Sequence, residues 1–168
     1  ADLADASYAI ETLIINGGEN DIREECVDSA TTNSDGSYWY NATCENAIAT
    51  TQQKIQNFFV RINSQTSINK YGYPPAIVWL GRYSMPGTVI HKSIVTRMND
   101  FMKAQCAAIN RCYFVDMESA WTAENATQYL DNHDPQATNG PAHVNATGGK
   151  ILAQRIWNVL TDPANNLS

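Results

Sequence analysis

The sequence predicts an α/β domain built around a parallel sheet. Three short, nearly continuous apolar runs are typical of strands that are buried on both faces. A segment with apolar residues at helical spacing follows each run. The predicted strands cover residues 12–16, 76–80 and 113–117, and the predicted helices cover residues 45–62, 92–109 and 146–160. Because strands and helices alternate along the chain, we expect parallel strands joined by right-handed crossovers.

Glycine and proline mark the ends of the first two strands, as they commonly do for regular structure. The first strand stops at Gly17-Gly18, and the second lies between Pro74-Pro75 and Gly81. Each predicted helix has one apolar face, which in the middle helix consists of Ile94, Val95, Met98, Phe101, Met102, Cys106 and Ile109. We also expect the end of a helix over residues 3–10, irregular structure over 22–44 and mostly loop over 119–144.

Composition indicates one globular domain. The chain has 168 residues, of which 43% are hydrophobic and only 17% are charged. These values argue against a disordered chain and against a charged coiled coil. The net charge of −6 disfavours a protein that binds the phosphates of a nucleic acid. No apolar run is long enough to span a bilayer, and no secretory leader precedes Ala1, so we expect a mature, processed or truncated chain without a membrane span.

Four cysteines favour disulfides over a zinc cluster, because none forms a CxxC pair and the chain has three histidines. Three pairings are open, and we favour the nearest-neighbour pairing of Cys26 with Cys44 and of Cys106 with Cys112. The first bridge would close a turn-rich loop and stabilise the fold by about 3 kcal/mol on the chain-entropy model. The alternative is four free, buried thiols.

Four sequons for N-glycosylation accompany the cysteines. They are centred on Asn41, Asn125, Asn145 and Asn166. Together with an even number of cysteines they favour a secreted or extracellular glycoprotein. An exported bacterial protein would carry the same triplets unmodified.

Two loops at the expected carboxyl edge of the sheet carry candidate catalytic groups, since ligands bind there in such folds. In the first, Gly18 lets the backbone approach a ligand and Asn20 offers an amide N–H to a developing oxyanion. In the second, His143 precedes the last helix and is placed to act as a general base. The alternatives are a plain tight turn and a surface histidine.

The two loops together resemble the SGNH (GDSL-type) hydrolase family. Gly18-x-Asn20-Asp21 is similar to the family's third block, and His143-x-Asn145-x-x-Gly148 is similar to its fifth block. The resemblance implies a flavodoxin-like three-layer α/β/α sandwich, with residues 1–168 as one SGNH hydrolase-like domain that forms the C-terminal portion of the family fold. It further implies that Asn20 lies in the oxyanion hole, that His143 activates a serine, and that no metal or organic cofactor takes part.

Two departures from the family pattern concern the other catalytic groups. The family's nucleophile lies in a Gly-Asp-Ser block well before the third block, and about sixteen residues precede Gly17 here. We therefore expect the nucleophilic serine and the N-terminal strands to be missing from this chain. The family's acid lies three residues before the histidine, where this chain has Gly140. Asp131 and Asp134 are nearby, and Asp134 is the best substitute if the loop bends back.

The expected three-strand sheet would leave the edge of strand 12–16 exposed, which proteins normally avoid. We therefore expect a second segment or subunit to cover the edge from Thr12 to Asn16. Asp116 and Glu118, at the end of the third strand, are candidates to line a polar pocket or to cap the next segment.

The leading hypothesis is a secreted SGNH-type ester hydrolase domain that acts on a small-molecule or carbohydrate ester carrying an acyl or acetyl group. The alternative is a non-catalytic secreted glycoprotein with the same fold that works in assembly or carbohydrate binding. Three features favour the alternative: the missing serine, the missing acid and the sequon at Asn145. If Asn145 instead caps the last helix, its side chain is taken up by hydrogen bonds from backbone N–H groups. A nucleotide binder is disfavoured because no glycine-rich phosphate loop opens a helix.

Overall fold

A computed structural model describes residues 10–17, 22, 25–26, 30–32, 38–64, 72–85, 92–122, 124–131, 143–165 and 167. The strands are β1 (Thr12–Ile15), β2 (Ala30–Thr32), β3 (Tyr38–Tyr40), β4 (Ala76–Leu80) and β5 (Cys112–Val115). The α-helices are α2 (Ala42–Asn63), α3 (Lys92–Ala107) and α4 (Ala146–Thr161). Short 3₁₀ turns are η2 (Glu118–Ala120), η3 (Ala126–Gln128) and η4 (Pro163–Asn165). The helix predicted over 3–10 falls outside the described residues except for Ile10.

The predicted parallel sheet is confirmed. Its strands lie in the order β1-β4-β5, and both pairings are parallel. Leu13 pairs with Ile77, and Val78 pairs with both Ile14 and Tyr113. The central strand β4 is buried on both faces, which explains why its sequence is an unbroken apolar run.

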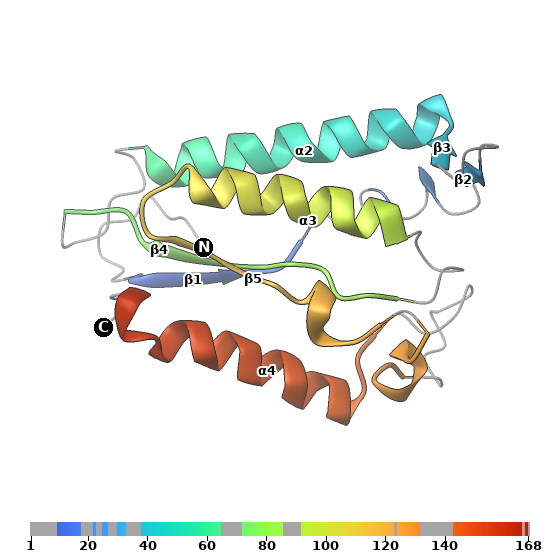
Figure 1. The fold of residues 1–168 in the computed structure, drawn as a ribbon. Coiled ribbons are helices and arrows are strands. Elements are labelled where there is room, and N and C mark those ends of the chain that lie inside the picture. Colours follow the sequence, from blue (N-terminus) through green and yellow to red (C-terminus); the bar gives the residue numbers. More distant parts are fainter. Residues whose placement is uncertain are drawn as a thin grey trace.

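The helices cover the sheet in two layers (Figure 1). Helices α2 and α3 lie side by side on one face, and α4 lies on the other. Strand side chains alternate between the faces, so Trp79 packs in the core beneath α2 and α3, whereas Val78 and Val115 pack against Leu152 and Ile156 of α4. This three-layer arrangement is compatible with a flavodoxin-like fold.

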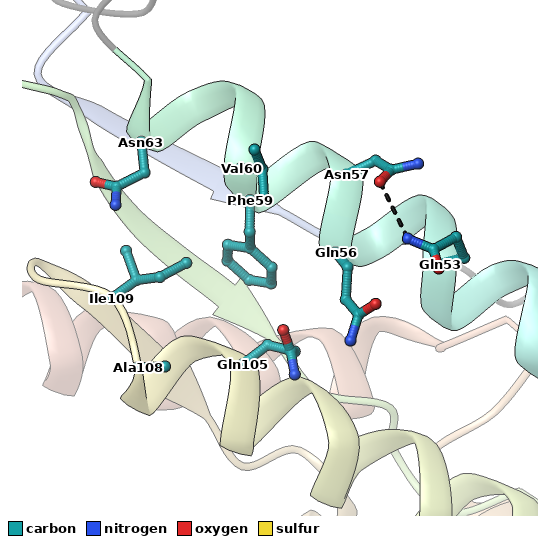
Figure 2. A pocket seen from close by; sticks show the side chains of 9 residues that line it. All are labelled: Gln53, Gln56, Asn57, Phe59, Val60, Asn63, Gln105, Ala108 and Ile109. Atoms are coloured by element: carbon teal, nitrogen blue, oxygen red, sulfur yellow. Dashed lines mark hydrogen bonds between the residues drawn. The ribbon is translucent and has the colours of Figure 1, made fainter.

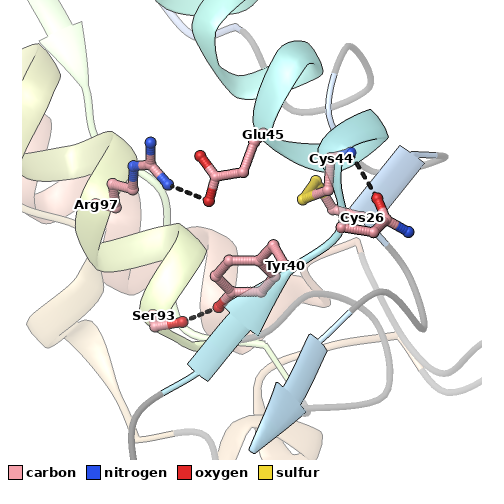
Figure 3. The surroundings of a disulfide bond; sticks show 7 residues. Cys26, Tyr40, Cys44, Glu45, Ser93 and Arg97 are labelled. Carbon is pink, nitrogen blue, oxygen red and sulfur yellow. Dashed lines mark hydrogen bonds and ion pairs between the residues drawn. A yellow bond between two sulfur atoms is a disulfide. The ribbon is translucent and has the colours of Figure 1, made fainter. Parts of the chain in front are cut away.

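Both favoured disulfides are present. The Cys26–Cys44 bond attaches the chain before the hairpin to the first turn of α2, and the Cys106–Cys112 bond joins the last turn of α3 to the start of β5. In Figure 3, the surroundings of the first bond are tied to α3, because the hydroxyl groups of Tyr40 and Ser93 are hydrogen-bonded.

The segment over 22–44 differs from the prediction of irregular structure. Strands β2 and β3 form an antiparallel ladder in which Thr31 pairs with Trp39. Each strand has only three residues, too few for a period-two pattern to stand out in the sequence. Helix α2 also starts three residues earlier than predicted, because Asn41 caps it by accepting a hydrogen bond from the Cys44 N–H at 2.9 Å.

Strand β1 lies at an edge of the described sheet, as expected from the sequence. Ile14 is 52% exposed, although its neighbour Val78 on β4 is fully buried. Ile14 points to the same face of the sheet as Val78, and α4 covers that face over β4 and β5. That a second segment or subunit covers the β1 edge stays a prediction.

Candidate functional site

The carboxyl ends of β4 and β5 and the start of α4 lie at the same edge of the sheet (Figure 1). Described loop segments over residues 81–85, 116–122, 124–131 and 143–145 meet there. In open parallel sheets this edge is where ligands bind. It is therefore the place to examine for catalytic and binding groups.

His143 is held at this edge by its backbone. Leu130 and Val144 form an isolated antiparallel bridge, and the N–H of Asp131 donates to the carbonyl oxygen of His143 at 2.7 Å. The His143 residue is exposed. A fixed backbone with an imidazole open to solvent is an arrangement that suits a general base.

Asn145 anchors the same segment from the other side. Its Oδ1 accepts hydrogen bonds from the N–H groups of Thr147 and Gly148 at 2.9 and 3.0 Å, which caps α4. Its Nδ2 donates to the carbonyl oxygens of Gln128 and Leu130 at 3.0 and 3.2 Å. Both amide hydrogens are thus in use, and Asn145 locks the loop before α4 to the loop after η3.

Gly148 allows a close approach that a larger residue would block. A Cβ atom at this position would lie 2.3 Å from the carbonyl oxygen of Tyr129, far inside van der Waals contact. The same carbonyl accepts a hydrogen bond from the N–H of Asn145 at 2.9 Å. The asparagine and the glycine of the His143-x-Asn145-x-x-Gly148 motif therefore both position the segment that carries the histidine.

A polar cleft of about 510 Å³ lies at this edge of the sheet, between the β4 and β5 loops. It is lined by Ser84, Lys92, Asp116, Glu118, Ser119, Trp121, Thr122 and Asn125. Trp121 connects the cleft to the His143 segment, because its ring stacks on Tyr129 with centroids 5.1 Å apart. The Trp121 indole N–H donates to the carbonyl oxygen of Ser84 at 2.6 Å, which fixes one wall of the cleft.

Glu118 is a positioned carboxylate in the wall of the cleft. Its two oxygens accept hydrogen bonds from the Thr96 hydroxyl at 2.5 Å and the Asn99 amide at 2.9 Å. The buried Asn99 also bonds both backbone groups of Arg82, accepting from its N–H at 2.7 Å and donating to its carbonyl at 3.0 Å. Helix α3 thus holds the ends of β4 and β5 together.

Asp116 organises the turn after β5. Its carboxylate accepts hydrogen bonds from the N–H groups of Glu118 and Ser119 and from the Ser119 hydroxyl. Partial burial would raise the pKa of Asp116, but these hydrogen bonds and the positive charge of Arg155 outweigh it and lower the pKa below 3.8. Arg155 of α4 also stabilises this turn, because it donates to the carbonyl oxygens of Asp116 and Ser119. The Asp116 carboxylate thus stabilises the turn, and it also lines the cleft.

Four predicted site residues lie outside the described residues: Gly18, Asn20, Asp134 and Asn166. The structure therefore brings the backbone of His143 together with that of Asp131, and it does not describe the predicted oxyanion loop. Sequence reasoning ranked Asp131 below Asp134 because the bridge that places Asp131 beside His143 has no local sequence signal. The cleft residues Ser84 and Lys92 carry no sequence motif and are not among the predicted site residues.

A second cleft of about 470 Å³ lies between α2 and α3 (Figure 2). It is lined by Gln53, Gln56, Asn57, Phe59, Val60, Asn63, Gln105, Ala108 and Ile109. Its walls offer amide hydrogen bonds, such as the one from Gln53 to Asn57 at 3.1 Å. None of the described residues that line it is ionisable, so the carboxyl-edge cleft is the better candidate for acid–base chemistry.

Within the described parts of the chain, no group of three or more histidine, cysteine, aspartate or glutamate side chains is arranged to hold a metal ion. The described helices include none with the length and apolar character required to cross a membrane. Comparison with known proteins finds no match: no family model fits the chain, and no curated protein or solved structure is significantly similar to it. The resemblance to SGNH hydrolases therefore stays a prediction.

Proposed function

We propose that this chain supplies the base and the oxyanion donor of a secreted SGNH-type ester hydrolase. The substrate would be an acyl or acetyl ester, a class that includes esters on carbohydrate. The observation that supports this proposal best is the construction around His143. The backbone of the histidine is bonded at the carboxyl edge, and the other motif residues, Asn145 and Gly148, hold its segment against Tyr129 and Leu130.

The proposed reaction is acyl transfer to a serine followed by hydrolysis. His143 accepts the proton of the serine hydroxyl as the oxygen attacks the ester carbonyl, and it returns that proton to the leaving alcohol. An amide N–H of Asn20 stabilises the oxyanion. Water then releases the acyl group by the same steps in reverse order. As expected from the sequence, the serine would come from residues other than 1–168.

Asp131 is the carboxylate that we propose to orient the imidazole of His143. In serine hydrolases an acid holds the histidine in the tautomer that can accept the proton. The hydrogen bond between the backbones of Asp131 and His143 supports this assignment over Asp134. The two disulfides support the secreted location, because such bonds persist in oxidising compartments.

A serine-directed fluorophosphonate tests this function. The product of the complete coding sequence is labelled with the probe, digested and mapped by mass spectrometry. We expect one labelled serine outside residues 1–168, and we expect the His143→Gln variant to lose the label. His91→Gln is the matched control for the loss of a histidine, and it should label as the wild type does.

Three results would contradict the proposal. They are the absence of any labelled serine in folded protein, a labelled serine within residues 1–168, and undiminished labelling of His143→Gln. The first would favour the second candidate function, non-catalytic carbohydrate binding. The polar cleft supports that candidate, because hydroxyl, amide and carboxylate groups converge beside the indole of Trp121.

A further inference from the structure

The carboxyl-edge cleft and one predicted glycosylation site share a residue. Asn125 is the acceptor of the sequon Asn125-Ala126-Thr127, and it is also one of the residues that line the cleft. Its Oδ1 accepts a hydrogen bond from the Thr122 N–H at 2.9 Å. A sugar attached through Nδ2 leaves Oδ1 unchanged, so this bond would survive glycosylation.

The other two described sequons have different surroundings. Asn41 is exposed at the start of α2, and its Oδ1 bonds the Cys44 N–H. Asn145 uses both Nδ2 hydrogens to bond Gln128 and Leu130. Among the sequons that the structure describes, Asn125 is therefore the one whose side chain opens into a cleft.

The walls of the cleft suit a neutral, polyhydroxylated ring. The carboxylates of Asp116 and Glu118 accept hydrogen bonds from hydroxyl groups, and Lys92 donates to ring or hydroxyl oxygens. Charges of both signs disfavour a strongly charged ligand. A volume of about 510 Å³ lies within the range of small-ligand pockets.

We propose that the cleft holds the first N-acetylglucosamine unit of a glycan attached to Asn125. In the attachment step, Nδ2 loses a proton and bonds to C1 of the sugar, while the pyrophosphate of a lipid-linked oligosaccharide donor departs. The sugar then bonds the polar groups of the β4 and β5 loops. This inference depends on the secreted location and is independent of ester hydrolysis.

The test uses the product of the complete coding sequence, secreted by a eukaryotic host and trimmed with an endoglycosidase that leaves one sugar on each occupied asparagine. Thr127→Ala removes the sequon and keeps Asn125. Thr43→Ala is the matched control, because it removes the Asn41 sequon by the same change at another exposed threonine. Glycopeptide mass spectrometry gives the occupancy, and hydrogen exchange reports on peptides covering residues 116–125.

We expect Asn125 to be occupied, and amide exchange over residues 116–125 to be about threefold or more slower in the trimmed wild type than in Thr127→Ala. Thr43→Ala should match the wild type in this region. An unmodified Asn125 beside an occupied Asn41 would overturn the proposal, as would an occupied Asn125 with no change in exchange. One further result would also overturn it: Asn125 is unmodified in the wild type, and added chitobiose slows amide exchange equally in the wild type and in Thr127→Ala. The cleft would then be assigned to a free sugar.

Discussion

The backbone N–H of Asp131 donates a hydrogen bond to the carbonyl oxygen of His143 at 2.7 Å. The neighbouring pair, Leu130 and Val144, forms an antiparallel bridge. These contacts join two segments that are not adjacent in the sequence. They place a carboxylate-bearing residue next to the candidate base at the edge of the sheet where ligands bind.

If Asp131 orients His143, the Asp131→Asn variant will hydrolyse esters more slowly, by roughly 10²- to 10⁴-fold in kcat. The KM should change little. Steady-state kinetics on a p-nitrophenyl ester measures both constants. A greater loss in Asp134→Asn than in Asp131→Asn would instead support the acid that the sequence favoured.

The contact between Gly148 and Tyr129 predicts opposite effects for two adjacent glycines. Gly148→Ala places a methyl group 2.3 Å from the Tyr129 carbonyl oxygen and should lower the free energy of unfolding by about 1–3 kcal/mol. A methyl group at Gly149 meets no atom within 4 Å. Gly149→Ala should therefore raise the stability by about 0.5–1 kcal/mol, because alanine favours the helix. Urea denaturation distinguishes the two, and equal effects would contradict the packing.

We expect no glycan on Asn145, although it lies in a sequon. Attachment would replace one of the two Nδ2 hydrogens that bond the carbonyl oxygens of Gln128 and Leu130. It would also force a sugar between the two loops that Asn145 joins. Glycopeptide mass spectrometry of folded, secreted protein measures this directly, and substantial occupancy at Asn145 would show that the junction is built differently.

Asp116 makes the stability of the β5 turn depend on pH. Its pKa is lowered below 3.8 in the folded protein, so its ionised form stabilises the fold above that pH. This contribution is lost as the pH falls below 3.8 and through the folded pKa. Asp116→Asn should therefore lower the Tm at neutral pH, with a difference from wild type that shrinks in acid. Asp100→Asn, an exposed position on α3, controls for the lost charge, and a constant difference would contradict the account.

The sheet and its helices were predictable because their patterns are local. Strand β4 matches its predicted range, 76–80, since it is an apolar run bounded by proline and glycine. The start of α2 was missed because Asn41 was interpreted as a sequon, whereas its side chain also caps the helix. The β2–β3 ladder was missed because each strand has three residues.

The site was less predictable because its contacts join distant segments. His143 was recognised from its motif and its place before α4. Glu118 is hydrogen-bonded to Thr96 and Asn99 on α3. These partners come together only when the chain folds. The choice of Asp131 over Asp134 likewise depends on one backbone hydrogen bond that no sequence pattern marks.

The proposed ester hydrolysis depends on His143 as the general base. The most direct test is the initial rate of p-nitrophenyl acetate hydrolysis by the product of the complete coding sequence and by its His143→Gln and His91→Gln variants. We expect hydrolysis by the wild type and by His91→Gln, with a loss of roughly 10²- to 10⁴-fold in His143→Gln. The role of His143 would be contradicted if folded wild-type protein hydrolysed the ester no faster than buffer alone. It would also be contradicted if the His143→Gln variant were as active as the wild type.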